Sequence, residues 1–197
     1  SNKIEYKVPI DDLRSIGSYK NKIFALSGSE GVSIYNETNL NLISNFSTNN
    51  NIAESKRTLD FFENNVLVAE GKEGVGVYNI STGNKSSSIK LPIISDSTID
   101  QNEVVTNSVT VTNDHVFTAN GAAGLIVHDL QDGINNISKT GTLDIDGSTN
   151  YVKSADGYIF VASGNGGLKI LKIIEPEKTG TSITCTGLPV YNGGSWL

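Results

Sequence analysis

The chain contains few of the residues that define several common protein classes. Its 197 residues include one cysteine, two histidines and no methionine. The single Cys185 excludes an intrachain disulfide and a cysteine-rich metal site, and we expect it to be a small apolar residue of a strand. Apolar runs such as 66–69 are short, whereas a membrane-spanning helix needs about 20 residues. We therefore expect no transmembrane segment.

Basic residues are also scarce. Fifteen Lys and Arg residues stand against 21 Asp and Glu residues, which gives a formal net charge of −6. Because a nucleic acid presents a row of negative phosphates, a chain of this charge is not expected to bind one. The length suits one compact domain. The first residue is Ser1, so we expect a truncated or processed chain.

A glycine-containing block of twelve residues occurs four times without gaps. The copies begin at Ile23, Val66, Val116 and Ile159, and their second glycines are Gly31, Gly74, Gly124 and Gly167. The spacings between these glycines are therefore 43, 50 and 43 residues. A period of this size is typical of repeat proteins built from one small sheet per repeat.

Each repeat carries the signals of four short strands. The middle two flank Gly-x-x-Gly, where glycine permits a positive φ and a tight reversal. The second strand is apolar at consecutive positions, which indicates burial on both faces. The expected first strands are 13–17, 58–62, 108–112 and 151–155, and the expected fourth strands are 42–46, 87–91, 139–144 and 182–186. The four units then span about 11–48, 55–92, 105–146 and 148–187, with 1–10 as the outer strand of a preceding unit and 188–197 as a tail.

Repeated four-stranded meanders that are buried on both faces predict an all-β fold, a β-propeller of four-stranded antiparallel blades. A β-solenoid or an elongated meander array is the alternative. Four blades can close a ring, but rings of six to eight are commoner. We therefore expect missing blades or a second copy of the chain to complete the ring, or else open edges at the first and last blades. A self-closed ring of four blades is the alternative.

The repeats resemble the LVIVD repeat family of bacterial and archaeal surface proteins. The segment from Gly121 to Leu130 is the nearest copy of the family pattern, and Glu73 to Ser81 is close, with Asn79 in place of the usual Asp. The first and fourth copies depart further, with Asn36 and Lys172 at that position. The resemblance implies a secreted or surface-attached propeller in an extracellular, cell-surface or periplasmic location. The family has no agreed activity, so the resemblance implies none.

The chemistry-bearing residues form no catalytic set. His115 and His128 lie in or beside predicted strands and lack the spacing of a metal-ligand pair. Asp144 and Asp146 before Gly147 make half of a calcium loop, but no distal glutamate follows. The Gly-x-x-Gly turns lack the helix and the Lys-Ser/Thr of a phosphate loop. We accordingly expect no metal and no cofactor.

Polar residues recur at one end of the predicted innermost strands. Arg14, Arg57, Asn107 and Asn150 each stand nine residues before a block, so we expect them at one mouth of the channel together with Lys72, Glu73 and the insertion at 92–106. Arginine forks there would favour an acidic ligand. Alternatively, these side chains cap backbone groups of neighbouring blades.

These observations favour a non-enzymatic binding or scaffold module of a secreted or cell-surface bacterial protein. The expected partner is a protein or glycan of the cell envelope, bound on the face at the channel mouth. The alternative is a propeller-type hydrolase or lyase that acts on a glycan or an ester.

Overall fold

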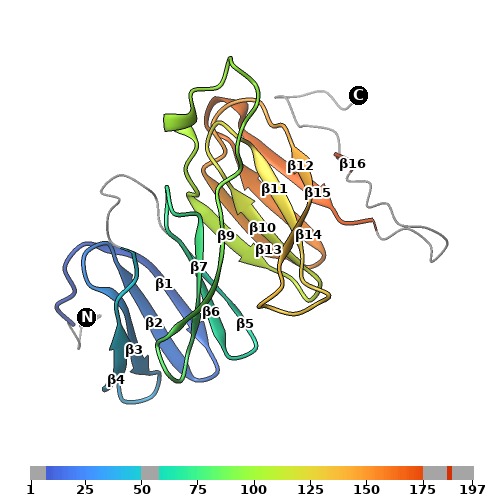
Figure 1. The fold of residues 1–197 in the computed structure, drawn as a ribbon. Helices are drawn as coiled ribbons and strands as arrows, with labels where there is room; N and C mark the ends of the chain where they lie inside the picture. Colours follow the sequence, from blue (N-terminus) through green and yellow to red (C-terminus); the bar gives the residue numbers. More distant parts are fainter. Residues whose placement is uncertain (1–7, 50–57, 175–185, 188–197) are drawn as a thin grey trace, which may run out of the picture.

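The fold consists of four separate four-stranded antiparallel sheets, each folded from one repeat (Figure 1). A computed structural model describes residues 8–49, 58–174 and 186–187. Blade I comprises β1 Leu13–Tyr19, β2 Lys22–Ser27, β3 Gly31–Asn36 and β4 Leu42–Phe46. Blade II comprises β5 Leu59–Phe62, β6 Asn65–Ala69, β7 Val75–Asn79 and β8 Lys85–Ile89; blade III comprises β9 Ser108–Val111, β10 His115–Ala119, β11 Leu125–Asp129 and β12 Ser138–Leu143. Blade IV comprises β13 Tyr151–Ala155, β14 Tyr158–Ala162, β15 Leu168–Lys172 and β16 Thr186–Gly187.

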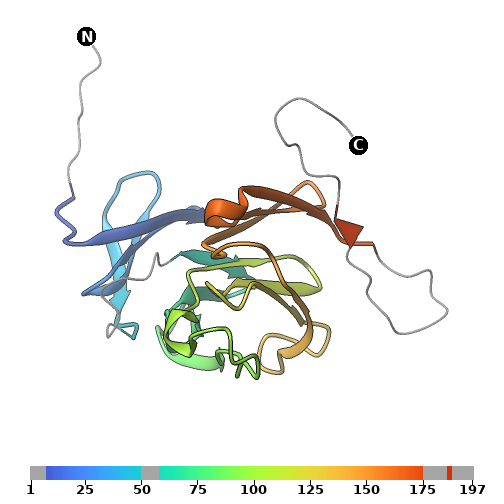
Figure 2. The ribbon, with the colours of Figure 1, turned by 90° about the horizontal axis from the view of Figure 1, so that it is seen from above.

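The blades form a β-propeller, as the repeat predicts. Strands follow one another in chain order within each sheet, and the first strands β1, β5, β9 and β13 all line one central cavity of about 230 Å³. Figure 2 shows the blades arranged in succession from the blue blade I to the orange blade IV. The only helical elements in the described residues are the short 3₁₀ turns η1 Gln101–Glu103 and η2 Gly164–Gly166.

Consecutive apolar residues in the second strands are explained by packing on two neighbouring blades. All five residues of β6 are buried: Val66 and Val68 pack in the cluster shared with blade I, whereas Leu67 and Ala69 pack in the cluster shared with blade III. Because side chains alternate across a strand, one strand supplies both cores. A third cluster joins blades III and IV in the same way. Within the described residues, none of the three clusters joins blade IV to blade I.

The glycine turns are equivalent in three of the four blades. In blades II, III and IV the second glycine donates to the first across the turn, at 3.1, 3.2 and 3.1 Å, and both glycines have positive φ. Blade I differs, because the φ of Gly28 lies outside the positive range and its N–H donates to Asp12 O at 2.9 Å. The aligned blocks predict that Gly28, Gly71, Gly121 and Gly164 occupy equivalent turns, and this prediction is wrong for Gly28.

Several predicted segments fall at or beyond the limits of the described residues. Residues 8–10 form no strand, and the rest of the expected outer strand at 1–10 lies outside the described residues. The expected fourth strand at 182–186 is represented by Thr186–Gly187 alone, and Cys185 and the tail at 188–197 are not described. No helix in the described part of the chain is long and apolar enough to cross a membrane.

Candidate binding face and channel

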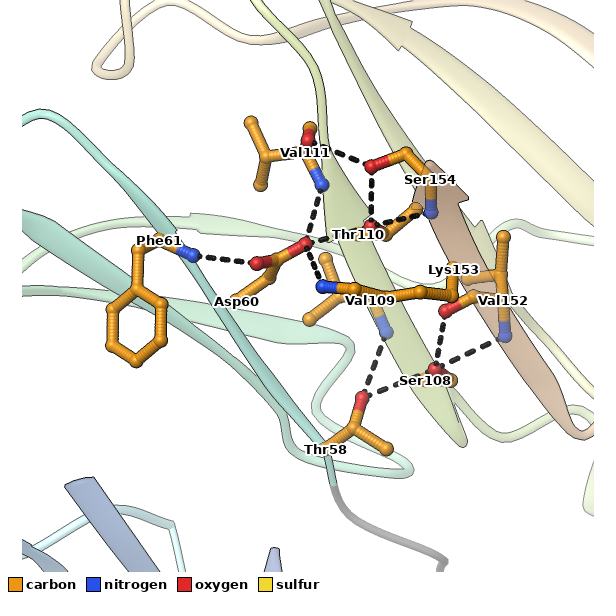
Figure 3. Close-up of polar contacts among 10 residues, drawn as sticks. All are labelled: Thr58, Asp60, Phe61, Ser108, Val109, Thr110, Val111, Val152, Lys153 and Ser154. Carbon is orange, nitrogen blue, oxygen red and sulfur yellow. Dashed lines mark hydrogen bonds and ion pairs between the residues drawn. The ribbon is translucent and has the colours of Figure 1, made fainter. Parts of the chain in front are cut away.

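The inner strands are joined by a ladder of side-chain hydrogen bonds from one blade to the next (Figure 3). Thr58 Oγ1 of blade II accepts from the backbone N–H of Val109 at 3.1 Å. One blade further, Ser108 Oγ accepts from the N–H of Val152 at 3.2 Å. Thr110 Oγ1 likewise accepts from the N–H of Ser154 at 3.1 Å. The inner strands of adjacent blades belong to separate sheets and form no backbone ladder with each other. The hydroxyl side chains of one blade instead accept from backbone N–H groups of the next blade.

Asp60 occupies the centre of this ladder. Its Oδ2 accepts from Thr110 Oγ1 at 2.6 Å and from Val111 N at 3.0 Å, and it lies 3.3 Å from Lys153 Nζ. Its Oδ1 accepts from Phe61 N at 3.0 Å. Both carboxylate oxygens are therefore engaged, with Oδ2 joining blades II, III and IV and Oδ1 bound within blade II, and Asp60 is not a free general base in the channel.

A second repeated device fixes the segment that enters each blade. The residue before the first glycine of each block is buried and polar in all four blades: Ser27, Glu70, Asn120 and Ser163. Ser27 Oγ donates to Asp11 O at 2.7 Å, and Ser163 Oγ donates to Asp146 O at 2.7 Å. We call these four residues the entry clamps, because each binds the segment that leads into its own blade.

The entry clamps of blades II and III use longer side chains. Glu70 Oε1 accepts from Asn49 N at 3.0 Å and from the hydroxyl of Tyr78, and Oε2 pairs with Lys85 Nζ at 2.7 Å. Asn120 Oδ1 accepts from Thr106 Oγ1 at 2.7 Å. A fully buried carboxylate is costly unless it is paired and hydrogen-bonded, and Glu70 is both.

The turns between second and third strands share one face with the connections between blades. Gly71 and Thr106 exchange two backbone hydrogen bonds at 3.1 and 2.9 Å, and Gly121 and Thr149 do the same at 3.0 and 2.9 Å. The blade II turn therefore holds the connection to blade III, as the topology predicts. We call this side the mouth face, and it comprises residues 8–14, 28–30, 71–73, 90–107, 121–123, 144–150 and 164–167.

The structure separates the predicted ligand residues into three groups. Asn107 is buried and its Nδ2 donates to Thr149 O at 3.2 Å and to Asn150 Oδ1 at 3.5 Å, so these two asparagines meet at the junction of blades III and IV. Arg14 is bound to Asp12, with Nε 2.6 Å from Oδ1. Lys72 and Glu73 are exposed in the blade II turn, and Arg57 lies outside the described residues.

The insertion forms an exposed, internally braced loop on the mouth face. Asp100 caps η1 by accepting from Asn102 N at 2.8 Å. Asp96 Oδ1 accepts from Thr98 Oγ1 at 2.7 Å and from Thr98 N at 2.8 Å, and these bonds lower the pKa of the Asp96 carboxyl. Both carboxylates stay exposed, so the loop presents negative charge to solvent.

Charge on the mouth face is mostly negative. Among the residues that the structure describes, its three basic side chains are Arg14, Lys72 and Lys90, and its nine acidic ones are Asp11, Asp12, Glu30, Glu73, Asp96, Asp100, Glu103, Asp144 and Asp146. Asp144 and Asp146 are both exposed. In the part of the chain that the structure describes, no three His, Cys, Asp or Glu side chains are grouped as metal ligands.

Both histidines are enclosed in blade III. His128 Nε2 lies 3.2 Å from Thr118 Oγ1, and burial together with the charge of Lys139 lowers the pKa of His128 to about 4. The ring is therefore neutral at neutral pH and fills a packed position, as its alignment with Tyr78 predicts. His115 is also buried and lies beside Phe117, with ring centroids 6.1 Å apart. His128 is enclosed, whereas the buried His115 is in the wall of a cavity of about 610 Å³ that Asp114 and Asp156 also line.

Sequence reasoning missed the ladder and the entry clamps. Both have a signal in the aligned repeats. Ladder residues such as Thr58 and Asp60 flank the aligned apolar position of the first strand, here Leu59. The clamps are the polar residues that stand immediately before the first glycine of every block.

Comparison with solved structures identifies the fold alone. The chain is similar to the computationally designed protein Ika4, with 14% identity, a TM-score of 0.58 and coverage of 86% of this chain and 95% of that one. It is also similar to the designed protein Ika8, with 13% identity, a TM-score of 0.59 and coverage of 82% and 46%. BamB from Moraxella catarrhalis matches with 13% identity, a TM-score of 0.56 and coverage of 80% and 42%. The chain thus spans less than half the length of Ika8 and of BamB.

No family model matches the chain. No curated protein matches it either.

Proposed function

We propose that this chain is a non-enzymatic binding or scaffold module of a secreted or cell-surface bacterial protein, and that its ligand lies on the mouth face. The fold is consistent with such a module. The extracellular, cell-surface or periplasmic location is proposed from the resemblance of residues 121–130 to LVIVD repeats.

The observation that carries the proposal is the repeated clamping of the mouth face. Each blade holds its entering segment with a buried polar side chain, from Ser27 in blade I to Ser163 in blade IV. A loop that is fixed at its base presents its exposed side chains in a constant arrangement, which lowers the entropy lost on binding. Residues 90–107 are the longest connection on this rigid base, and such loops commonly carry function.

The chemistry of the channel supports binding over catalysis. Asp60 is fully engaged by Thr110, Val111, Phe61 and Lys153, and both histidines are buried in blade III. A hydrolase or lyase would need an accessible acid, base or nucleophile beside a pocket. The alternative function therefore has less support than the binding function.

The charge of the mouth face bears on the class of ligand. The guanidinium of Arg14 is held by Asp12. One of the two arginines that the sequence suggests for binding an acidic group is therefore already paired. Nine acidic side chains against three basic ones favour a protein or glycan of the cell envelope that presents amino or guanidinium groups. Lys72 and Glu73 are proposed to contribute at the exposed turn of blade II.

The test is a binding screen of envelope proteins and of glycans with and without amino sugars. In the test variant Asp96→Asn, Asp100→Asn and Glu103→Gln remove charge from the mouth face while the amide oxygens keep the loop's internal acceptors. In the matched control Asp114→Asn, Asp132→Asn and Asp156→Asn remove three exposed charges from the opposite face. We expect the first triple to weaken binding about tenfold or more and the second to leave it within about twofold. Equal effects of the two triples, or steady turnover of an ester or glycan by the parent chain, would contradict the proposal.

A further inference from the structure

The two ends of the blade series expose surfaces that are buried everywhere else in the molecule. We call the side of a blade that packs on the preceding blade its leading face, and the side that packs on the following blade its trailing face. On the trailing face of blade III, Phe117, Ala119, Leu125 and Val127 are at most 6% exposed. The aligned residues on the trailing face of blade IV are Phe160, Ala162, Leu168 and Ile170, of which Leu168 is 57% and Ile170 36% exposed.

The leading face of blade I shows the same contrast. Ile16 aligns with Leu59, Val109 and Val152, which are 8, 2 and 1% exposed. Each of these three residues packs in the apolar cluster that its blade shares with the preceding blade. Ile16 itself is 67% exposed. Leu42, in the outer strand of the same face, is also exposed; it pairs with Tyr35, the equivalent of the buried Tyr78.

Both end faces therefore keep the composition of an internal junction. Repeat arrays that end in solvent usually close with a unit whose outer face is polar, because an apolar end face promotes association. Here the end faces carry Ile, Leu and Phe at the junction positions instead. Exposed apolar side chains at junction positions favour an interaction site.

We infer that a second copy of this chain covers these faces, with blade IV of one copy packed on blade I of the other. The occupant is argued from the repeat itself: the trailing face of blade IV is equivalent to the trailing face of blade III, and the leading face of blade I is equivalent to the leading face of blade IV. The junction of blades III and IV already shows that such faces fit. A head-to-tail contact closes when the rotation permits, and two copies with two such junctions make a closed ring of eight blades.

We expect apolar contacts to hold this junction, because the ladder position of Asp60 and Thr110 is not continued into it. Lys153 takes the position of Thr110 on blade IV, and a lysine cannot accept from a backbone N–H. The junction of blades I and II gives the precedent. There Gly17 takes the ladder position, and the blades pack through aromatic rings instead, with Tyr19 stacked on Phe61 at 4.8 Å.

This inference is independent of the proposed ligand on the mouth face. Its test is the mass of the chain in solution, measured by sedimentation from micromolar to hundreds of micromolar concentration. We expect a two-chain species for the parent. Leu168→Asp on blade IV and Ile16→Asp on blade I should each raise the dissociation constant about a hundredfold or more, because each places an unpaired charge in the junction. Ile93→Asp, at an isoleucine that is 96% exposed in the 92–106 insertion, is the matched control and should leave the two-chain species intact.

Mixing the two variants identifies the head-to-tail arrangement. Each variant alone lacks one face of every junction, but the mixture can form one junction between the intact blade IV of Ile16→Asp and the intact blade I of Leu168→Asp. We expect the mixture, and neither variant alone, to recover two-chain species. A parent that stays monomeric across the concentration range, forms open polymers, or dimerises in spite of either substitution would overturn the inference. Circular dichroism of each variant shows whether loss of the two-chain species is caused by unfolding. If an aspartate variant is unfolded, Leu168→Ser or Ile16→Ser replaces it, with the same expected result.

Discussion

Lys153 Nζ lies 3.3 Å from Asp60 Oδ2, so one ion pair joins the inner strand of blade IV to that of blade II past blade III. The two residues are 93 positions apart in the chain. Asp60 also accepts from Thr110 and Val111 of blade III, so a single carboxylate contacts three blades. The inner wall of the propeller is therefore held by a few polar side chains as well as by the apolar cores.

Removing this carboxylate should cost far more stability than removing its lysine partner. Asp60→Ala leaves the Thr110 hydroxyl and the Val111 N–H without their acceptor, which we expect to lower the free energy of unfolding by about 2 to 4 kcal/mol. Lys153→Met should cost about 1 kcal/mol or less, because Lys153 is half-exposed. Urea denaturation of both variants checks this, and an equal loss in the two would show that the ion pair rather than the hydrogen bonds carries the effect.

The second glycine of each block should differ in importance between blades. Gly74 has φ +84°, and a Cβ there would lie 2.0 Å from the carbonyl oxygen of Ile89 in the outer strand. Gly167 has a similar φ of +75°, but none of the residues that the structure describes lies within 4 Å of its Cβ position. We expect Gly167→Ala to cost about 1 kcal/mol from backbone strain alone. Gly74→Ala should cost at least about 3 kcal/mol, because a strand must also move. Thermal unfolding of the two variants compares them, and similar melting temperatures would contradict the account.

His128 should make the protein sensitive to mild acid. Its pKa is lowered to about 4 by burial first and by Lys139 second, whereas the unfolded chain has a His pKa near 6.5. The unfolded state therefore binds the proton more readily, so stability that is present above pH 6.5 is lost as pH falls toward 4. The expected loss is about 3 kcal/mol over that range.

His128→Tyr, which copies the aligned Tyr78, should remove most of this loss, and Lys139→Met should reduce it in part. The measurement is the free energy of unfolding at pH 7 and at pH 4.5. Parallel pH profiles for the parent and His128→Tyr would mean that other groups cause the acid sensitivity.

The repeat predicted the blades because their strands obey local rules. Val66 to Ala69 are apolar at every position, and only burial on two sides explains such a run outside a helix. The aligned position of Leu59, Val109 and Val152 likewise identified the inner strands. Strand ends were less predictable: β8 spans Lys85–Ile89 and not 87–91, because backbone pairing with β7 sets the limit.

The candidate site was predictable only in outline. The sequence placed Asn107 and Arg14 on the correct side of the molecule, but their partners Thr149 and Asp12 decide how much of each side chain remains for a ligand. The Asn107–Thr149 bond depends on the distance between blades, which a single sequence does not encode locally, whereas Arg14 and Asp12 are only two positions apart. The entry clamps could have been read from the repeat, since a polar residue before a buried turn needs a partner.

The most direct test of the open ends is a disulfide between blade IV and blade I. In the junction of blades III and IV, Thr110 Oγ1 lies 3.0 Å from Ser154 Oγ, and the aligned residues at the two ends of the chain are Lys153 and Ser18. The chain with Lys153→Cys and Ser18→Cys, in a Cys185→Ser background, is oxidised gently and run on a non-reducing gel. We expect a band of two linked chains that the added Leu168→Asp substitution abolishes. A disulfide within one chain, which would mean that blades I and IV close on each other, or the absence of any disulfide would contradict the account.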